Sequence, residues 1–535
     1  MNIKNEIRQL LSLDNVLCSI MTIYCTINAL CSIYTSSFFQ NIKGYLLLIC
    51  ITIATITFIG LKIIFKKTEN IYFKCGNYRK KELIIYSTLI VFACVVSIAW
   101  NYPASIHSDA MHQYHQATTN QYNDIHPLLH TLIFFKIPSI IWQSYTSCAI
   151  SQCLFIYLVL MYFCYFCRKY YLNLTQTVVF LTFILINPTF LKMATMPLKD
   201  VPFSYSLLLG TLFLIEIFIS NGEWLTKKHN KILFCLVCFC IVFFRHNGLA
   251  NFLLMIIPLI ISYKASKCFF ITLCITFTIS KLIAAPIFNT FGIKKTWSKA
   301  ELIGVPLNHP LNTISYIYNN GGIVSEYDKE IMNKINDLDN WEKYYNKYSF
   351  YNFKKSNHGY NEEYVAQNYG EIIKTWLQMA YKNPVLAIKS EINITSHIWC
   401  VQKSFNFIDK KYIVIEYSGP QWVSNIMDKY VQILQRTHFK NIMIDVGEGL
   451  LLILLSLCLT IRKMQHNNKA YIPYILVLSN VLVILCLITS GAPRFVYSSI
   501  LCSYPLILYA LLGQSKNYKD LSNRETIIPQ KAPII

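Results

Sequence analysis

The sequence predicts an all-α, polytopic membrane protein with about twelve transmembrane helices and one large, mostly helical polar domain. Its 535 residues are 54% hydrophobic and only 14% charged, with a mean hydropathy of +0.39. Soluble globular chains carry roughly 25% charged residues. Apolar runs of about 20 residues, the length that crosses the hydrocarbon core of a bilayer, recur along the chain. The composition therefore excludes a water-soluble enzyme of this size, a disordered chain and a disulfide scaffold.

The predicted spans are separated by short polar turns, except for a first outer loop at 101–146 and one long polar segment late in the chain. The twelve are residues 15–35, 44–65, 83–100, 147–167, 176–191, 201–220, 232–245, 249–263, 268–289, 445–461, 470–489 and 495–513. Residues 128–145 are also apolar, but they contain Lys136, Pro138 and Gln143. We expect this segment to form an interfacial or re-entrant helix on the outer membrane face.

Basic residues set the expected orientation. The net charge is +21, and clusters of Lys and Arg follow the even-numbered spans, so that all of them lie on one side. By the positive-inside rule that side is the cytoplasm, and both termini lie there too. We therefore expect a multi-pass protein of the cell membrane in contact with membrane lipid. The positive charge is explained by topology, so no nucleic-acid partner is expected. The first apolar run is too long for a cleavable signal peptide.

Five regions follow from this topology. They are a two-span extension with a basic loop (1–82), a transmembrane core (83–290) with a first outer loop (101–146), an extracytoplasmic domain (291–443), the last transmembrane helices (444–513) and a cytoplasmic tail (514–535). Within the outer domain, residues 337–347, 362–381 and 423–436 have helical spacing.

The first outer loop offers a candidate catalytic acid. Asp109 lies in it together with five of the twelve histidines of the chain. An ionised carboxylate here could remove a proton from a hydroxyl nucleophile. One alternative is that Asp109 merely caps the helix that follows, since Asp is a favoured N-cap residue. Another is a divalent cation held by Asp109, His112 and His115, because carboxylate and imidazole suit such ions.

Three more outer turns carry isolated cations. Lys199 and Asp200 lie between spans five and six, Arg245 and Asn247 between spans seven and eight, and Arg494 before the last span. Arg can bind a phosphate through two hydrogen bonds, and Lys supplies a point charge. Each has a simpler explanation, such as pairing of Lys199 with Asp200 or snorkelling of Arg245 to the interface. Together the three cations at one membrane depth indicate a site for a lipid-linked phosphate.

These motifs, in this order, resemble the GT-C superfamily of integral membrane glycosyltransferases, which contains protein O-mannosyltransferases and aminoarabinose transferases. The resemblance is to a poorly characterised bacterial branch and spans about residues 83–500. The matching motifs are Ser108-Asp109…Gln113…Gln116, His126-Pro127-Leu128-Leu129-His130, Leu198-Lys199-Asp200-Val201-Pro202-Phe203, Arg245-His246-Asn247-Gly248, Ala492-Pro493-Arg494-Phe495, Val305-Pro306-Leu307-Asn308-His309-Pro310-Leu311 with Asn320-Gly321-Gly322, and Trp376-Leu377…Asn383-Pro384.

The resemblance implies a polyprenyl-phosphate-linked sugar donor and an acceptor outside the cytoplasm. It carries over one role, in which Asp109 acts as the base or binds a site metal. Together with the chemistry of the other outer residues, nine residues are predicted to have roles. Asp109 and His126 would be catalytic, Lys199, Arg245 and Arg494 would bind the donor phosphate, and Gln113, Asp124, Asp200 and Asn247 would bind substrate. Such families often have a second acid near the first; here histidines flank Asp109, and Asp124 is the only spare carboxylate.

Two other classes of function stay open at this point. A polysaccharide polymerase or ligase also uses outer-face arginines, but its product would grow by whole repeat units. A transporter of lipid-linked oligosaccharides should place charges near the bilayer midplane and show broken helices in repeated halves, whereas the charges here gather at one face. The sugar, the acceptor, the metal requirement and the oligomeric state do not follow from the sequence.

Overall fold

A computed structural model describes most of the chain. The described residues are 12–34, 46–68, 79–290, 292–293, 306–347, 350, 353–354, 358–401, 418–436, 446–464, 467–487 and 493–512. The predicted tail at 514–535 and residues 491–492 of the last outer turn lie outside them. All regular secondary structure in the described part is helical, and no strand occurs there.

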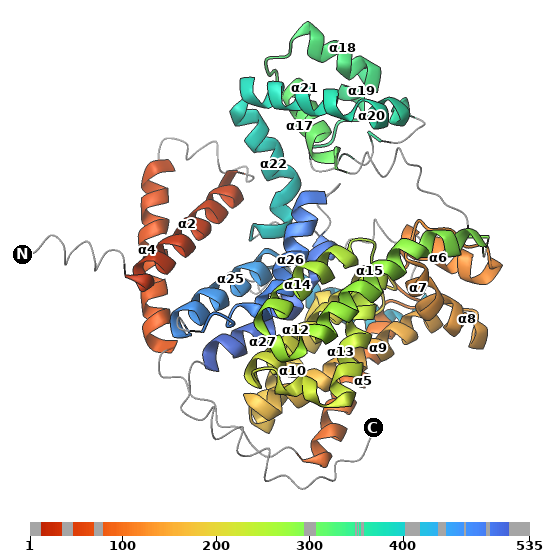
Figure 1. The fold of residues 1–535 in the computed structure, drawn as a ribbon, viewed down its shortest axis with the longest axis vertical. Coiled ribbons are helices and arrows are strands. Elements are labelled where there is room, and N and C mark those ends of the chain that lie inside the picture. The colour runs from red at the N-terminus through yellow and green to blue at the C-terminus, as the bar shows by residue number, and fades with distance from the viewer. Residues whose placement is uncertain are drawn as a thin grey trace, which may run out of the picture.

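Figure 1 shows how the helices are arranged. They are α2 (Leu13–Tyr34), α4 (Leu46–Thr68), α5 (Lys80–Trp100), α6 (Ser108–Thr119), α7 (Leu128–Thr131), α8 (Ile137–Ile141), α9 (Tyr145–Tyr170), α10 (Leu174–Leu185), α11 (Pro188–Ala194), α12 (Asp200–Ile219), α13 (Lys228–Phe243), α14 (Gly248–Ser262), α15 (Lys267–Thr290), α17 (Asn308–Asn319), α18 (Glu326–Ile335), α19 (Leu338–Lys343), α20 (Glu362–Gln367), α21 (Tyr369–Lys382), α22 (Pro384–Trp399), α23 (Gln421–Arg436), α25 (Val446–Lys463), α26 (Ile472–Leu487) and α27 (Tyr497–Leu512). Short turns of other helix types add η2 (Leu132–Lys136), η3 (Glu223–Thr226), η4 (Lys264–Ser266) and η7 (Pro493–Val496).

Each of the twelve predicted spans coincides with a helix or, for 176–191, with the pair α10 and α11, which bends by 69°. Seven helices among the described residues are long and apolar enough to cross a membrane, or eight if the bent pair is one span. The segment Leu128–Ile141, predicted to be interfacial or re-entrant, is apolar but too short for that test, as are α14 and α26. The coarser prediction, an all-helical membrane protein with several spans, is confirmed.

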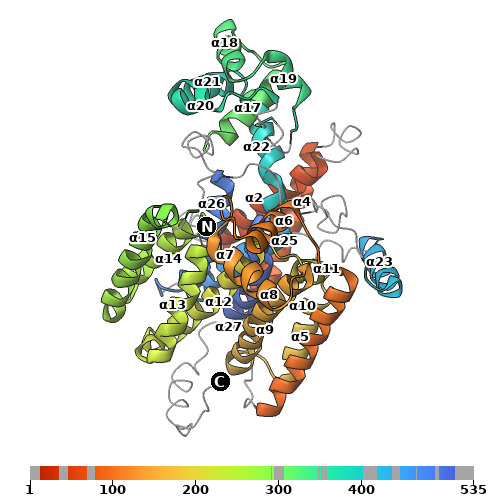
Figure 2. The same ribbon diagram turned by 90° about the vertical axis from the view of Figure 1, so that its right-hand side faces the viewer.

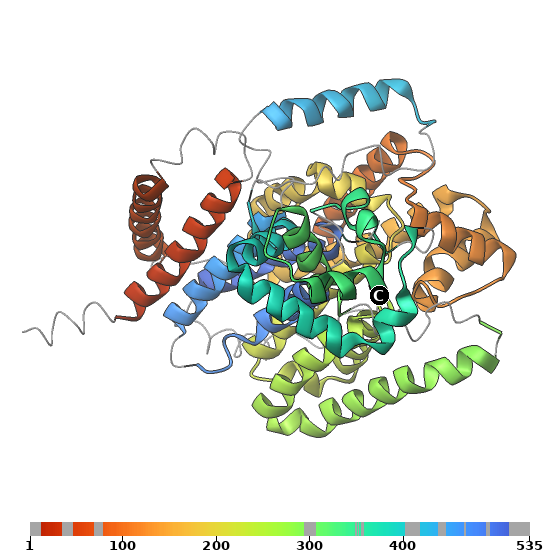
Figure 3. The same cartoon turned by 90° about the horizontal axis from the view of Figure 1, so that it is seen from above.

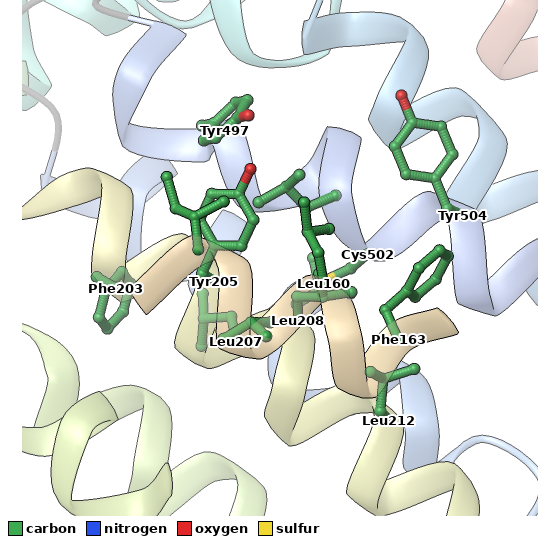
Figure 4. Packing of buried hydrophobic residues seen from close by; sticks show 14 of the residues in the cluster. Leu160, Phe163, Phe203, Tyr205, Leu207, Leu208, Leu212, Tyr497, Cys502 and Tyr504 are labelled. Carbon is green, nitrogen blue, oxygen red and sulfur yellow. The ribbon is translucent and has the colours of Figure 1, made fainter. Parts of the chain in front are cut away.

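The core is built around α12, of which 89% is buried. It packs against α9, α13, α26 and α27, and Figure 4 shows side chains of α9, α12 and α27 meeting there. The rings of Tyr205 and Tyr497 lie 6.2 Å apart, edge to face, a favoured aromatic geometry. Gly210 lets α26 approach, because a Cβ atom at this position would lie 2.7 Å from Leu476 Cδ2.

The polar domain stands at one end of this bundle. In Figure 1, α17 to α21 lie together at the top and α22 runs down from them to the apolar helices, where it contacts α25 and α26. The domain has its own core, in which Trp341 is fully buried. The segment predicted as one helix at 362–381 forms two, α20 and α21, which meet at Asn368. The segment predicted at 337–347 is helical only as α19, whereas the one at 423–436 is confirmed as α23.

Helix α23 lies along the side of the bundle, as seen from the side and from above (Figures 2 and 3). It packs on α5, and the Tyr430 hydroxyl donates a hydrogen bond to the Ile186 carbonyl, 2.8 Å away. The candidate site forms at the end of the bundle that includes η7, which α22 of the polar domain contacts.

Candidate functional site

Five charged side chains from four separate segments form one network, which we call the outer cluster: Asp109, Lys199, Asp200, Arg245 and Arg494. An Asp109 carboxylate oxygen lies 3.6 Å from Lys199 Nζ and 3.4 Å from Arg494 Nη2. The Asp200 carboxylate lies 3.0 Å from Arg245 Nε and 3.7 Å from Arg494 Nε. Arg494 therefore joins the two acids, and the sequence prediction that these residues share one end of the bundle agrees with their contacts.

Asp109 occupies the first turn of α6, and His107 is the N-cap residue. The alternative in which Asp109 itself caps the helix is therefore wrong. Its side chain is 26% exposed. Burial opposes its ionisation, but the charges of Lys199 and Arg494 outweigh burial and hold the pKa of Asp109 well below its usual range. Asp109 is thus an anion at neutral pH.

Lys199 and Asp200 are neighbours in sequence but do not pair with each other. Lys199 is the N-cap of α12 and Asp200 is its first residue. The amine of Lys199 reaches Asp109, whereas the Asp200 carboxylate, 1% exposed, meets Arg245 and Arg494. A carboxylate in the first turn of a helix is also stabilised by the helix dipole. The simpler explanation that Lys199 pairs with Asp200 is therefore wrong.

His126 contacts Lys199. Its Nδ1 atom lies 3.0 Å from Lys199 Nζ, so a neutral imidazole can accept a hydrogen bond from the amine. Burial and the charge of Lys199 lower the pKa of His126 to about 3. His112 packs edge-on against the His126 ring, with centroids 5.4 Å apart. This places His126 as a neutral support for Lys199.

The guanidinium of Arg245 is held by rings as well as by charge. It lies 5.5 Å from the ring centroid of Phe203 and 5.0 Å from that of Phe495, and Nη1 donates to the Phe495 carbonyl at 3.3 Å. Cation–π contacts of this kind strengthen when they are removed from water, and the Arg245 side chain is 10% exposed. Arg245 therefore does not extend to solvent, as simple snorkelling would require, but is buried against two aromatic rings.

The outer cluster carries an excess of positive charge. Its three cations and two carboxylates leave a net charge of +1, since His126 is neutral. One guanidinium nitrogen, Arg494 Nη1, is buried with no hydrogen-bond partner among the described residues. Buried charged donors normally have a partner. This arrangement suits an anion with several oxygen acceptors, such as a phosphate.

Sequence reasoning missed the residues that hold the turn before Lys199. The Gln152 amide, buried on α9, donates to the carbonyls of Met193, Ala194 and Met196 at 2.9, 3.0 and 2.9 Å. A glutamine inside the apolar run 147–167 was the available signal, because a buried amide needs partners. On the other side of the turn, buried Lys192 donates to Asn101 Oδ1 at 2.8 Å.

Three other predicted residues lie nearby with different contacts. Gln113 is buried, and its amide lies 2.9 Å from His130 Nδ1 and from Thr131 Oγ1, which ties α6 to α7. The Asn247 side chain makes no hydrogen bond with the residues that the structure describes, and Asn247 precedes α14. Asp124 is half-buried in the loop before His126. Of the four predicted substrate-binding residues, only Asp200 belongs to the outer cluster.

The described side chains around Asp109 do not form a set of metal ligands. Among the described residues, no three His, Cys, Asp or Glu side chains converge as metal ligands do. The nearest charged neighbours of Asp109 are cations, which disfavour a second positive charge at the same oxygens.

Comparison with known proteins identifies the family but no activity. Residues 119–495 match the model of a family of unknown function (DUF6020). Because the match covers more than half of the chain, the protein belongs to this family. The matched segment contains Lys199, Asp200, Arg245 and Arg494 and begins after Asp109. No curated protein and no solved structure matches the chain.

Proposed function

We propose that this DUF6020 protein is a membrane glycosyltransferase, which moves a sugar from a polyprenyl-phosphate-linked donor to a glycan, lipid or protein acceptor outside the cytoplasm. The observation that carries the proposal is the convergence of Asp109 and Arg494, 385 positions apart, in one cation-rich cluster. The order of motifs that resembles GT-C enzymes supplies the reaction class, and the electrostatics of the outer cluster supply the fit to a phosphate.

The proposal includes a topology of twelve spans in the cell membrane, with both termini in the cytoplasm. In this arrangement the ends of α9 and α25, where Arg168, Lys169, Arg462 and Lys463 gather, face the cytoplasm. The outer cluster and the polar domain then lie on the extracytoplasmic side.

The net charge of the outer cluster matches the charge of its ligand before and after transfer, which supports the roles of the residues. The donor is a phosphodiester with one negative charge, which the net charge of +1 of the outer cluster balances. During transfer, the acceptor oxygen forms a bond to the anomeric carbon while the bond from that carbon to the phosphate oxygen breaks. The leaving polyprenyl phosphate gains a second negative charge. The acceptor proton moves to Asp109 and neutralises it, so the cluster becomes +2 and again balances its ligand.

The low pKa of Asp109 in the free protein is compatible with its role as the base, because a bound phosphate would raise it. In the free protein, Lys199 and Arg494 make Asp109 a weak base. A bound phosphate competes for the same two cations and takes up part of their charge. The pKa of Asp109 then rises toward its ordinary value, and its oxygens are freed for the acceptor hydroxyl. Lys199, Arg245 and Arg494 stabilise the charge that grows on the leaving group.

The test is sugar transfer in proteoliposomes supplied with polyprenyl-phosphate mannose or glucose and with extracytoplasmic membrane glycans as acceptor. Asp109→Asn should reduce transfer about 10²- to 10⁴-fold, the usual effect of losing a general base. The matched control is Asp14→Asn, because Asp14 also pairs with an arginine, Arg462 at 2.8 Å, but at the opposite end of the bundle. Undiminished transfer by Asp109→Asn would refute the assigned base. Growth of the product by whole repeat units would indicate a polymerase instead.

A further inference from the structure

The polar domain contains a second candidate site, separate from the outer cluster. We propose that the groove between α17, α21 and α22 binds sugar units of the acceptor. This inference rests on the proposed function for its link to an acceptor, but the binding itself can be tested alone. The groove has a volume of about 370 Å³ and is lined by residues of all three helices: Thr313, Trp376, Ala380, Ala387, Ile388, Glu391, Ile392, Thr395 and Trp399.

Two indole rings give the groove its apolar surface. Trp399 is fixed in place, because its Nε1 donates to Thr395 Oγ1 at 3.2 Å and that hydroxyl donates to the Glu391 carbonyl at 2.6 Å. The Nε1 atom of Trp376 is buried without a hydrogen-bond partner among the described residues. Trp376 therefore offers the groove its ring surface, and Ala380 and Ala387 leave room beside it.

One carboxylate stands at the wall of this apolar groove in a fixed orientation. Glu391 Oε2 lies 2.9 Å from His309 Nδ1, and Oε1 accepts a hydrogen bond from Thr313 Oγ1 at 3.1 Å. The Asn312 amide donates to Ser390 Oγ at 3.0 Å and holds α17 against α22. The Glu391 side chain is still 41% exposed, so its remaining lone pairs can accept hydrogen bonds from a ligand.

These features match one chemical class. A pyranose ring has a face of C–H groups that packs on an indole ring and a rim of hydroxyl groups that donate to a carboxylate. Binding sites for small molecules are mostly apolar with a few fixed polar groups, which is the composition of this groove. The volume admits one or two sugar rings. A fatty chain would match the indole rings but would leave the Glu391 carboxylate facing hydrocarbon without compensation.

The position of the groove connects it to the outer cluster. Its long wall is α22, which descends to the bundle (Figure 1) and contacts η7, the turn that carries Arg494. At the lower end of α22, the Trp399 carbonyl accepts hydrogen bonds from Tyr24 and Asn28 of α2, at 2.9 and 2.6 Å. A glycan held along α22 would therefore extend from the polar domain toward the end of the bundle where transfer is proposed.

The experiment measures the binding of oligosaccharides to the full-length protein, by saturation-transfer NMR and by affinity titration. The protein is held in phosphatidylcholine nanodiscs, which carry no sugar headgroups. The probes are mannotetraose, maltotetraose and chitotetraose, with decanoate as an apolar competitor. We expect at least one oligosaccharide to bind through the C–H protons of a ring face. Trp376→Ala should weaken that binding at least fivefold, and Glu391→Gln at least threefold.

Trp422→Ala is the matched control, because Trp422 on α23 is 68% exposed and lies outside the groove; binding should not change. The proposal is overturned if no probe binds, if Trp376→Ala binds as the unchanged protein does, or if decanoate displaces the sugar and binds more tightly. Asp109→Asn should bind the oligosaccharide normally. Normal oligosaccharide binding by the unchanged protein, combined with no sugar transfer from any polyprenyl-phosphate donor, would refute the proposed function and leave the groove assignment intact.

Discussion

The two ends of the helix bundle both contain acids paired with basic side chains, but the pairs differ in kind. At the end opposite the polar domain, Glu82 accepts two hydrogen bonds from Arg168, at 2.6 and 3.0 Å. Their side chains are 5% and 4% exposed. Glu216 on α12 meets Lys169 at 3.3 Å and also accepts from the Tyr170 hydroxyl. Each of these two acids has its own cation, so each pair sums to zero charge.

The outer cluster is looser, more exposed and not neutral. The contacts of Asp109 measure 3.4 and 3.6 Å, and the side chains of Asp109, Lys199 and Arg494 are 26%, 17% and 18% exposed. One positive charge remains unbalanced. A pair that serves only stability is expected to be close, dry and neutral, because any uncompensated buried charge costs free energy. The difference indicates that the pairs Glu82–Arg168 and Glu216–Lys169 hold helices together, and it supports the proposal that the outer cluster binds an anion.

The largest expected effect is on stability and comes from the buried pair Glu82–Arg168. Glu82→Gln leaves the Arg168 charge buried without its partner, which should cost about 3–5 kcal/mol of stability. Thermal unfolding in detergent measures it. The matched control is Glu330→Gln, which removes an exposed pair with Lys334 and should cost less than about 0.5 kcal/mol. Equal melting temperatures for the two variants would mean that the buried pair does not support the bundle.

The next effect is on ligand affinity and comes from the outer cluster. Arg494→Gln removes the excess cation but leaves Lys199 with Asp109 and Arg245 with Asp200, so the fold should persist. Binding of geranylgeranyl phosphate should weaken about tenfold to a hundredfold, which corresponds to the roughly 1.5–3 kcal/mol of a hydrogen bond to a charged group. Arg462→Gln is the control at the other end, with similar exposure at 13%. If both variants bind alike, the contrast between the two ends has no functional meaning.

The smallest effect is a pH dependence that involves His126. Its pKa in the folded protein is lowered to about 3, whereas an unfolded histidine titrates near 6.5. The unfolded state therefore binds the proton more readily, and the stability that this neutral imidazole contributes is present above pH 6.5 and is lost as the pH falls toward 3. Relative to His126→Gln, the protein should lose roughly 2 kcal/mol between pH 7 and pH 5. A pH-independent difference between the two melting temperatures would contradict a buried neutral His126.

The sequence predicted the positions of the helices better than the contacts of the charged residues. Every predicted span has a helix, because apolar runs of sufficient length have few other structures available in hydrocarbon. The break between α10 and α11 was not predicted, although Asn187 and Pro188 mark it: Asn187 caps α11 through the Thr189 amide. In the polar domain, the helical spacing of apolar residues predicted one helix, but Asn368 separates two helices, α20 and α21. The spacing continues across the break because both helices bury the same side, so the pattern alone does not reveal the turn.

The sequence predicted which residues form the candidate site but did not predict which of them contact each other. Asp109, Lys199, Asp200, Arg245 and Arg494 were all singled out from the sequence, because charged side chains in apolar surroundings are costly and stand out. Gln152 was overlooked, since a single amide among apolar residues looks like tolerated polarity until its three carbonyl partners are known. The contact of His126 with Lys199, 73 positions away, depends on how the outer loop folds back over α12.

The amino-acid sequence by itself determined that this chain is helical, that it belongs in a membrane and that its charges collect at helix ends, because the cost of burying polar groups in hydrocarbon acts on each segment independently. Tertiary structure alone decided which charges meet. Lys199 and Asp200 diverge because α12 begins between them, and Asp109 finds its cations on helices that are distant in sequence. Such pairings depend on the packing of whole helices, which no local pattern of residues specifies.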